Sequence, residues 1–336
     1  KKIGFEGDVY VDKAQATIDM LKTTYYFNDT VRLTKNAIQL KDIRLYDVDR
    51  NQGTLNGLIN HDGTFGNMKY NVNIRARNLL AMNTHAADNE YFFGKAYATG
   101  TVNIFGDTKE ANIQVNAVTR PGSKGSIQMG GASTAADNNF ITFIDPRQKQ
   151  TQETEPEQPA LPQSAFNVKV DLQFEVTPDA QVELLVDPKA GDVISGRGNG
   201  NLRVQFDSFS DLKLFGSYVI DEGFYLFTLQ TVIRKEFKID RGSTISWSGD
   251  PFDAKVDIRA LYNLTAPLGD LLDDVGSTTN RGNVPVNCVL QLTDNLMKPN
   301  IKFDIDLPSS DEGVKQKVRS VINTEESMNR QIASLL

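Results

Sequence analysis

The residues that could do chemistry are few and stand apart in the sequence. The two histidines, His61 and His85, lie in short polar stretches, and neither has a nucleophile close by in a recognisable motif. Asp270, Asp273 and Asp274 follow one another without the alternating ligand spacing of a calcium loop, so solvated acids are favoured over a calcium site. We therefore predict that the protein is not an enzyme and that it holds no metal and no cofactor.

The single cysteine and one glycine series have structural explanations. Cys288 occupies an apolar position in an alternating stretch, which suits a small buried side chain better than a nucleophile or a metal ligand. Gly196, Gly198 and Gly200 resemble a phosphate-binding loop in spacing alone, because such a loop is followed by a helix. Here residues 202–206 continue the strand pattern. The glycines are therefore predicted to mark bends in a strand or a close approach of another backbone.

Alternating apolar and polar residues dominate the stretch from 194 to 262, which predicts successive strands with one apolar face. Such a face must be kept from water. The apolar positions of these strands are Leu202, Val204, Phe206, Leu212, Leu214, Tyr218, Ile220, Phe237, Ile239, Ile245, Trp247, Val256 and Ile258. Around residues 224–229 the two faces are equally apolar, so the inward side of Tyr225, Phe227 and Leu229 stays open.

The first half has the same character. Strands are predicted at residues 38–45, 53–59, 70–76, 94–105 and 111–118. The turn residues between them favour antiparallel or meandering sheet over crossovers through helices. Within this half, Val102 and Ile104 follow a glycine series in the same way as Leu202 and Val204 do, which indicates a weak internal repeat.

Composition shifts predict four segments: N-terminal β-repeats (1–145), a Pro/Gln/Glu-rich linker or insertion (146–165), a C-terminal β-domain (166–308) and a helical tail (309–336). Segment 146–165 could be a domain boundary or a surface insertion in one sheet, because strands of one type flank it. The apolar stripe of the tail could cap one end of the sheet or dock on a continuation of the chain. A polar loop is expected at 263–285.

Bulk properties narrow the possible partners. The 336-residue chain has a formal net charge of −7, and its basic residues alternate singly with acidic ones, so nucleic-acid binding is not expected. No apolar run approaches the roughly 20 residues that span a bilayer. A strand pattern already under way at Ile3 and Phe5 indicates a mature or truncated fragment of a longer protein, whose signal or anchor would lie upstream.

Several of these motifs together resemble the C-terminal region of TamB proteins. They are the alternating strands at 200–220, the segment Gly223–Phe227, the strand at 243–247 followed by Gly249-Asp250-Pro251, the strand at 254–262 and a closing strand that ends at Leu307-Pro308. The resemblance is most specific from about Gly196 to Leu336. In the first half it is carried by weaker motifs, chiefly 53–57 and 94–106.

The resemblance implies an all-β fold in which an elongated curved sheet is folded lengthwise into an apolar groove, with a short C-terminal helical segment. It also implies a periplasmic part of an envelope protein, anchored upstream in the inner membrane, with a TamA-like Omp85 barrel as partner in the outer membrane. The groove would conduct phospholipids by their acyl chains, and the protein would support outer-membrane protein assembly. The alternative from the residues alone is a structural or adhesin-type β-scaffold in which the same side chains fill a closed core.

Overall fold

The computed structural model describes residues 6–63, 67–89, 91–129, 166–187, 190–229, 233–267, 271, 282–322 and 324–335, and their strands form one 17-stranded sheet. The strands are β1 (Gly7–Ile18), β2 (Thr23–Thr34), β3 (Ala37–Tyr46), β4 (Gln52–Asn60), β5 (Lys69–Thr84), β6 (Phe92–Asp107), β7 (Glu110–Thr119), β8 (Lys124–Gln128), β9 (Asn167–Val176), β10 (Gln181–Asp187), β11 (Asp192–Asp207), β12 (Ser210–Leu229), β13 (Ile233–Ile239), β14 (Ser243–Gly249), β15 (Lys255–Pro267), β16 (Asn283–Asn295) and β17 (Asn300–Asp306). The described helices are a 3-10 turn, η1 (Asp19–Leu21), and the terminal α2 (Glu312–Val321) and α3 (Glu325–Leu335).

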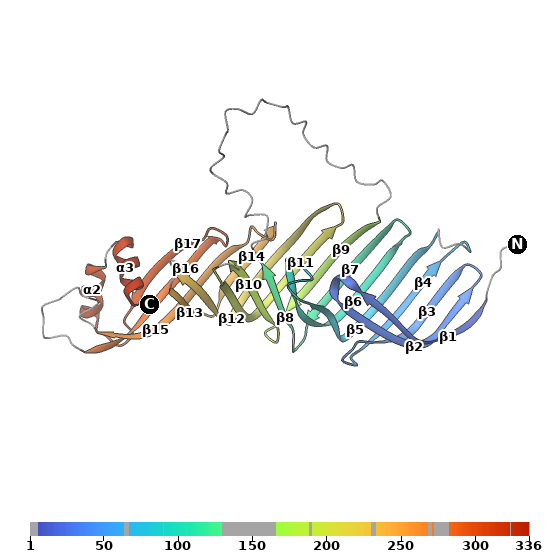
Figure 1. The fold of residues 1–336 in the computed structure, drawn as a ribbon, viewed down its shortest axis with the longest axis horizontal. Helices are drawn as coiled ribbons and strands as arrows, with labels where there is room; N and C mark the ends of the chain where they lie inside the picture. The colour runs from blue at the N-terminus through green and yellow to red at the C-terminus, as the bar shows by residue number, and fades with distance from the viewer. Residues whose placement is uncertain are drawn as a thin grey trace, which may run out of the picture.

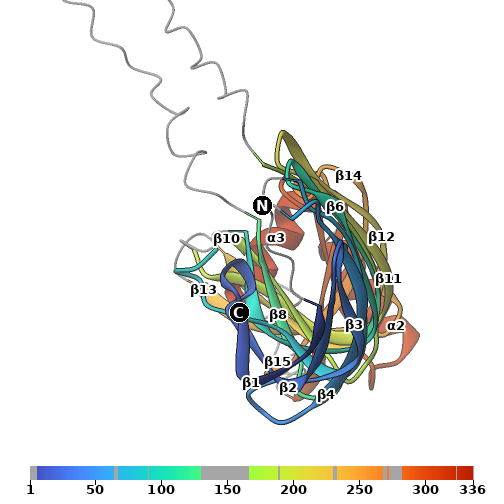
Figure 2. The ribbon, with the colours of Figure 1, turned by 90° about the vertical axis from the view of Figure 1, so that its right-hand side faces the viewer.

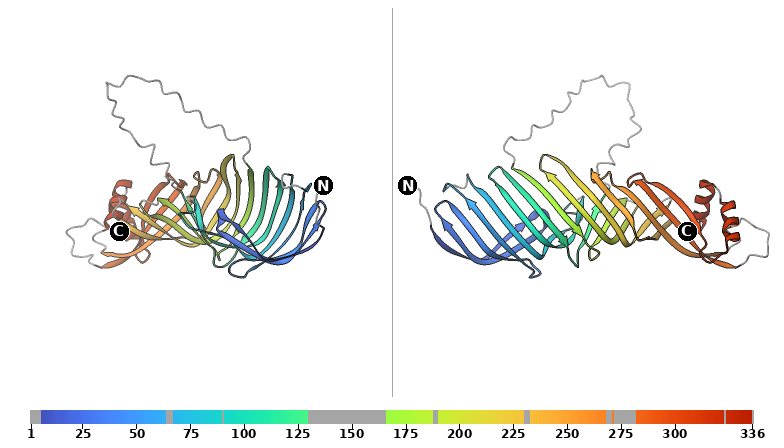
Figure 3. Two further views of the ribbon diagram at one scale, coloured as in Figure 1. Left: turned by 45° about the vertical axis from the view of Figure 1, so that its right-hand side comes forward. Right: turned by 180° about the vertical axis from the view of Figure 1, so that it is seen from behind.

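The sheet is elongated and follows chain order from β1 at one end to β17 at the other (Figure 1). Strands β1 to β6 each pair antiparallel with the next strand, and β15 and β16 do the same. Figure 3 shows this order from two further sides, with α2 and α3 beside β17 at the C-terminal end. The expectation of a mostly β protein with a short helical tail is confirmed.

Three pairs of short strands behave as single strands with a bend. Strand β6 pairs with β8 through residues 92–95 and with β7 through residues 98–106. In the same way β11 divides its length between β10 and β9, and β12 between β13 and β14. In the order β6, β7, β9, β11, β10 and β8, each strand pairs with the next, and β8 pairs with β6. These six strands therefore form a closed ring of pairings. Figure 2 shows the result, a sheet whose two sides curve toward each other as two walls.

Antiparallel pairing is confirmed for β3 to β7, the strands for which it was expected, whereas two pairs at the centre of the sheet are parallel. Strands β7 and β9 run parallel, and so do β8 and β10. Turn signals predict antiparallel pairing only between strands joined by a short loop, whereas a long connection also permits parallel pairing. Here the connection is residues 130–165, which lie outside the described residues and include the predicted linker 146–165. One sheet therefore contains strands from both sides of it, while the division into four domains stays a prediction.

Other boundaries also differ from expectation. The polar loop predicted at 263–285 is shorter, because β15 continues to Pro267 and β16 begins at Asn283. The alternation of Leu264 and Ala266 with polar residues continues β15, and Val284 and Val286 face them from β16. Of the acids Asp270, Asp273 and Asp274, none lies within the described residues. The β1–β2 hairpin, which pairs through most of its length, was predicted only at its first strand.

The buried apolar residues form two clusters of unequal size. The smaller lies on β2 and β3 and contains Val31, Ile43 and Leu45. The larger extends from Met129 and Leu184 through β11 to β17 and includes residues of both terminal helices. In that cluster Ile332 of α3 is fully buried, so the apolar stripe of the tail caps the C-terminal end of the sheet.

Glycine permits close backbone contact where the sheet bends. A Cβ atom built on Gly100 of β6 would overlap the carbonyl oxygen of Asn116 and crowd the Cα of Ala117, its register partner on β7. No side chain fits there without moving the neighbouring backbone. Gly198, one of the glycines predicted to mark bends or close approach of another backbone, is in a similar position, because a Cβ atom there would overlap the carbonyl oxygen of Val219 on β12; close approach is confirmed there.

Replacing Gly100 with alanine should lower the free energy of unfolding by about 1–3 kcal/mol, because the added methyl group must push β6 away from β7. The matched control is Gly125→Ala on β8, where a Cβ atom would meet nothing within 4 Å. That control should change the free energy of unfolding by less than about 1 kcal/mol. Urea denaturation followed by circular dichroism measures both, and equal effects of the two substitutions would contradict the close-approach explanation.

Candidate functional site

An uninterrupted row of apolar side chains crosses the sheet from β3 to β12. Each member is the register partner of the next, so all of them project from one face, which we call the inner face. We call this row the apolar ladder, and its members are Ile43, Leu55, Ile74, Val102, Val115, Leu172, Val204 and Leu214.

The neighbouring row on the opposite face is almost wholly polar. It runs through the residues that follow or precede the ladder in each strand: Arg44, Thr54, Arg75, Thr101, Asn116, Gln173, Arg203 and Phe215. We call this opposite face the outer face. On it, Arg203 forms a bidentate ion pair with Asp171, with distances of 2.8 and 2.6 Å from its Nε and Nη2 atoms to the carboxylate oxygens. From β3 to β12 one face is therefore apolar and the other mostly polar, as expected for strands with a single buried face.

Burial of the ladder changes along the sheet. The members from Leu55 to Val204 are half-buried, and the same holds for Ile104 and Phe206 in the adjacent inner-face row. At Leu214 the exposed fraction falls to 5%. The part of the inner face that β4 to β9 contribute is therefore partly open to solvent, whereas the part beyond it is closed.

The candidate residues predicted from the sequence fall into two groups, one in the closed part of the inner face and one that is half-buried. Those in the closed part belong to the large buried cluster: Leu202, Leu214, Tyr218, Ile220, Phe237, Ile239, Ile245, Trp247, Val256 and Ile258. The half-buried ones are Val102, Ile104, Val204, Phe206 and Leu212. The structure thus brings Val102, Ile104, Val204 and Phe206 together on the partly open surface and packs the residues of the closed part into a core, while Leu212 is half-buried and outside that core.

Aromatic rings fill the closed part. Phe227 lies 6.2 Å from Phe237 and 6.1 Å from Phe303 between ring centroids, and Tyr225 lies 5.4 Å from Phe227. These contacts settle the orientation that the sequence left open for Tyr225 and Phe227, both of which point inward; the side chain of Leu229 lies outside the described residues. Burial raises the pKa of the Tyr225 hydroxyl.

Sequence reasoning missed half of the open surface. Leu55, Ile74, Val115 and Leu172 belong to the same row as Val102; the strands of the first three were predicted but not their place in a site, and no strand was predicted around Leu172. Alternation identifies the apolar face of each strand separately. Which residues of different strands stand side by side depends on register, and register across the parallel pair β7–β9 has no local signal.

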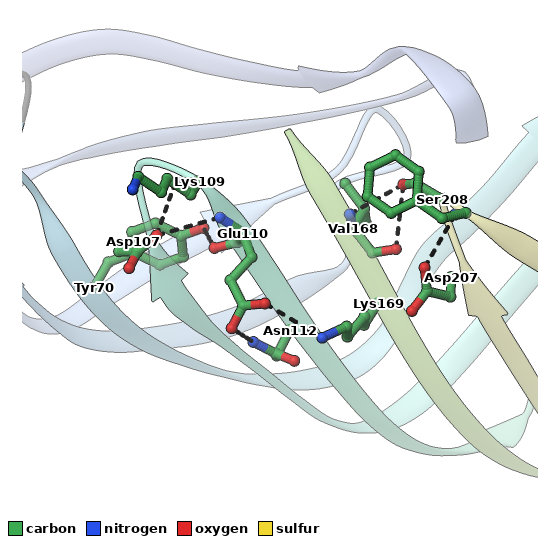
Figure 4. A network of polar contacts seen from close by, with 10 residues as sticks. Tyr70, Asp107, Lys109, Glu110, Asn112, Val168, Lys169, Asp207 and Ser208 are labelled. Atoms are coloured by element: carbon green, nitrogen blue, oxygen red, sulfur yellow. Dashed lines mark hydrogen bonds and ion pairs between the residues drawn. The ribbon is translucent and has the colours of Figure 1, made fainter. Parts of the chain in front are cut away.

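One edge of the open part is fastened by polar contacts between turns (Figure 4). Asp107 accepts hydrogen bonds from the backbone N–H groups of Lys109 and Glu110, at 2.7 and 3.2 Å, and these bonds hold the pKa of its carboxyl below the usual range. Glu110 also accepts from Lys169 Nζ at 3.3 Å, which joins β7 to β9. Ser208, in the turn between β11 and β12, accepts from the N–H of Val168 at 3.0 Å. These groups position the strands and offer no free acid–base pair.

The candidate chemical groups remain isolated. His61 accepts a hydrogen bond from the N–H of Gly63 at 3.1 Å in a turn, and His85 Nδ1 lies 3.5 Å from a carboxylate oxygen of Asp88. In the part of the chain that the structure describes, no three His, Cys, Asp or Glu side chains are grouped so as to hold a metal ion. A depression of about 300 Å³ near Phe105, Lys169 and Lys213 has a mostly polar lining and lies apart from the closed core.

Cys288 is fully buried between β15 and β17, as predicted, and burial raises its pKa to about 12. Because only the thiolate attacks maleimides, native protein at pH 8 should react with N-ethylmaleimide about a hundredfold or more slowly than protein unfolded in guanidinium. Mass spectrometry of timed samples measures both rates. Similar rates in the two states would show that the core around β16 is not closed.

No helix among the described residues has the length and apolar content of a membrane span. A search of curated proteins and a search of solved structures gave no match. The family profile of the TamB C-terminal domain matches residues 42–336, which include the strands from β4 onward and both terminal helices. This match covers most of the chain and confirms the resemblance drawn from the strand motifs. The chain belongs to the TamB family, a family of the bacterial envelope whose members act in translocation and assembly.

Proposed function

We propose that the inner face of the folded sheet is a groove that binds the acyl chains of phospholipids and conducts them toward the outer membrane. The observation that supports this most directly is the apolar ladder, whose members from Leu55 to Val204 form an uninterrupted apolar surface that is only half-buried. Soluble proteins seldom leave a contiguous apolar surface of this kind open without a binding role.

The free energies favour such a surface as a lipid path. Each methylene group moved from an apolar site into water costs about 0.8 kcal/mol, so the two chains of a phospholipid cost on the order of 20 kcal/mol or more in free solution. A groove that replaces bilayer contacts with Val102, Ile104, Val204 and Phe206 removes most of this cost. The charged head group can stay in water at the open side. Transfer then requires a difference in lipid chemical potential and no catalytic residue, consistent with an assembly and transport family.

The buried candidates have a different place in this proposal. Leu202, Leu214, Tyr218, Ile220, Phe237, Ile239, Ile245, Trp247, Val256 and Ile258 line the same inner face farther along, in its closed part. They would contact lipid only after the two walls separate. In the structure as it stands, the surface open to acyl chains is the part that β4 to β9 and the end of β11 contribute.

The setting of this activity follows from the family. We propose that the chain works in the periplasm as part of an envelope protein anchored upstream in the inner membrane, and that a TamA-like Omp85 barrel receives it at the outer membrane. Support of outer-membrane protein assembly is proposed on the same ground. The edge strand β17, which pairs with β16 alone among the described strands, is a candidate for contact with a barrel strand.

The second candidate is a structural scaffold with no lipid cargo. The closed packing of β11 to β17 favours it, because those strands look like the core of an ordinary β-protein. It leaves unexplained why the ladder stays half-buried over β4 to β9. A test must therefore compare the inner and outer faces of the same strands.

Val102→Asp and Val204→Asp should each weaken binding of labelled phospholipid about tenfold or more, because a carboxylate held against an acyl chain loses its hydration without gaining a partner. The matched controls are Thr101→Asp and Asn201→Asp, exposed positions on the opposite face of the same strands. These should bind within about twofold of the unchanged protein. The assay measures lipid retained after incubation with phosphatidylethanolamine/phosphatidylglycerol vesicles and removal of the vesicles.

Circular dichroism and thermal melting select variants that keep the fold before binding is compared. Equal binding by folded inner-face and outer-face variants would contradict a lipid-binding inner face and would favour the scaffold function. The substitution Ile258→Arg is unsuitable for this comparison, because Ile258 is 1% exposed and a charge there would test folding instead.

A further inference from the structure

Two aromatic contacts bring together strands that lie far apart in the order of the sheet. The rings of Tyr91, just before β6, and Phe252, just after β14, have centroids 6.1 Å apart. The rings of Phe227 on β12 and Phe303 on β17 are also 6.1 Å apart. Because β7, β9, β11 and β12 stand between β6 and β14, the first pair would be roughly 24 Å apart in a flat sheet, at about 4.8 Å per strand. The sheet therefore curls until its walls touch.

The two pairs differ in burial. Phe227 is 6% exposed and lies within the large cluster, so it belongs to the interior of the closed part. Tyr91 is 45% exposed and Phe252 is half-buried. The Tyr91–Phe252 pair therefore lies at the surface, where the two walls meet and where separation would begin.

Phe252 is held firmly by its own wall. Trp247 of β14 donates a hydrogen bond from Nε1 to the carbonyl oxygen of Pro251 at 3.1 Å, and Asp250 accepts from the N–H of Phe252 at 2.8 Å. Asn295 donates to the carboxylate of Asp253 at 2.6 Å, which ties the same turn to β16. The position of the Phe252 backbone is thus fixed by contacts that do not involve the other wall.

Tyr91 is held as firmly by the opposite wall. Its carbonyl oxygen accepts from the N–H of Gln128 at 2.8 Å, and its N–H donates to Asn89 at 2.8 Å. The adjoining Met129 donates its N–H to Leu185 of β10 and is 1% exposed. The ring contact joins two firmly held backbones at the surface, and it can break without loss of the backbone hydrogen bonds that hold Tyr91 and Phe252.

We propose that Tyr91 and Phe252 form a clasp that keeps the walls together over the closed part of the inner face. In this proposal the clasp controls whether an acyl chain can pass from the half-buried residues, such as Phe206, to the buried ones, such as Tyr218. The role in lipid passage rests on the proposed function. With the clasp shut, a chain bound along the ladder stops where burial rises between Val204 and Leu214. When the clasp opens, the large cluster becomes part of the path.

The test uses variants that open or tether the clasp and a readout that needs no lipid. Trp247 is the single tryptophan of the chain, is 5% exposed and hydrogen-bonds the turn that carries Phe252. Tyr91→Ala should increase acrylamide quenching of its fluorescence about two- to tenfold, as expected when one aromatic pair is removed from an opening equilibrium. The control Tyr10→Ala removes a ring that is 65% exposed on β1 and should leave quenching unchanged.

Tethering is done with Tyr91→Cys combined with Phe252→Cys and a short bismaleimide. Cys288 is buried and does not compete for the reagent. Quenching in the tethered protein should stay at or below the value of the unchanged protein. If Tyr91→Ala and the tethered form are quenched equally, while both melt as the unchanged protein does, the clasp is refuted whatever the protein binds.

The lipid readout separates this inference from the proposed function. A photo-reactive benzoylphenylalanine replaces Phe206 in one protein and Tyr218 in another, and each is irradiated with phospholipid vesicles. We expect adducts at position 206 in every form, and adducts at position 218 that rise about two- to tenfold in Tyr91→Ala and vanish on tethering. Equal labelling at position 218 in tethered and opened proteins overturns the gate. Absence of adducts at position 206 overturns lipid binding, and the quenching result then still decides whether the clasp exists.

Discussion

The structure depends on one constraint: the strands from β3 to β12 carry an uninterrupted row of apolar side chains on one face of a wide sheet, and that face must be shielded from water. The register partners from Ile43 to Leu214 show how far this continues without a polar interruption. A single layer has no second sheet to cover it. The sheet instead bends along its length, so that its own two walls shield the inner face between them (Figure 2).

Bending has local causes that can be named. The chain turns within the bent strands β7–β8, β9–β10 and β13–β14, and Gly100 allows the backbone of β7 to approach more closely than any side chain would permit. Where the walls meet, from β11 onward, aromatic rings close the space. Where they stay apart, the ladder remains half-buried. The open and closed parts therefore belong to one sheet and differ in how far apart its two walls lie.

Much of this could be predicted from local pattern. Alternation placed the strands from 194 to 262 and assigned Cys288 to the core, and cap residues with helical spacing of apolar residues identified the tail, because each depends on residues a few positions apart. Three features could not be predicted that way. The parallel β7–β9 pairing joins strands on either side of residues 130–165. The register partners of Val102 come from two other strands, β5 and β7. Ile258 is buried and Val204 only half-buried because of how closely the walls approach at each place. These are properties of the whole sheet, and the pattern within one strand does not contain them.

The central claim is that the inner face carries acyl chains. Native mass spectrometry of the purified chain, after exposure to phospholipid vesicles and their removal, tests it most directly. The account predicts discrete protein species that carry one or more intact phospholipids, which dissociate when detergent competes for the apolar surface. Protein that remains free of lipid at every vesicle concentration, with its β-structure intact, would contradict the claim and leave the sheet as a scaffold.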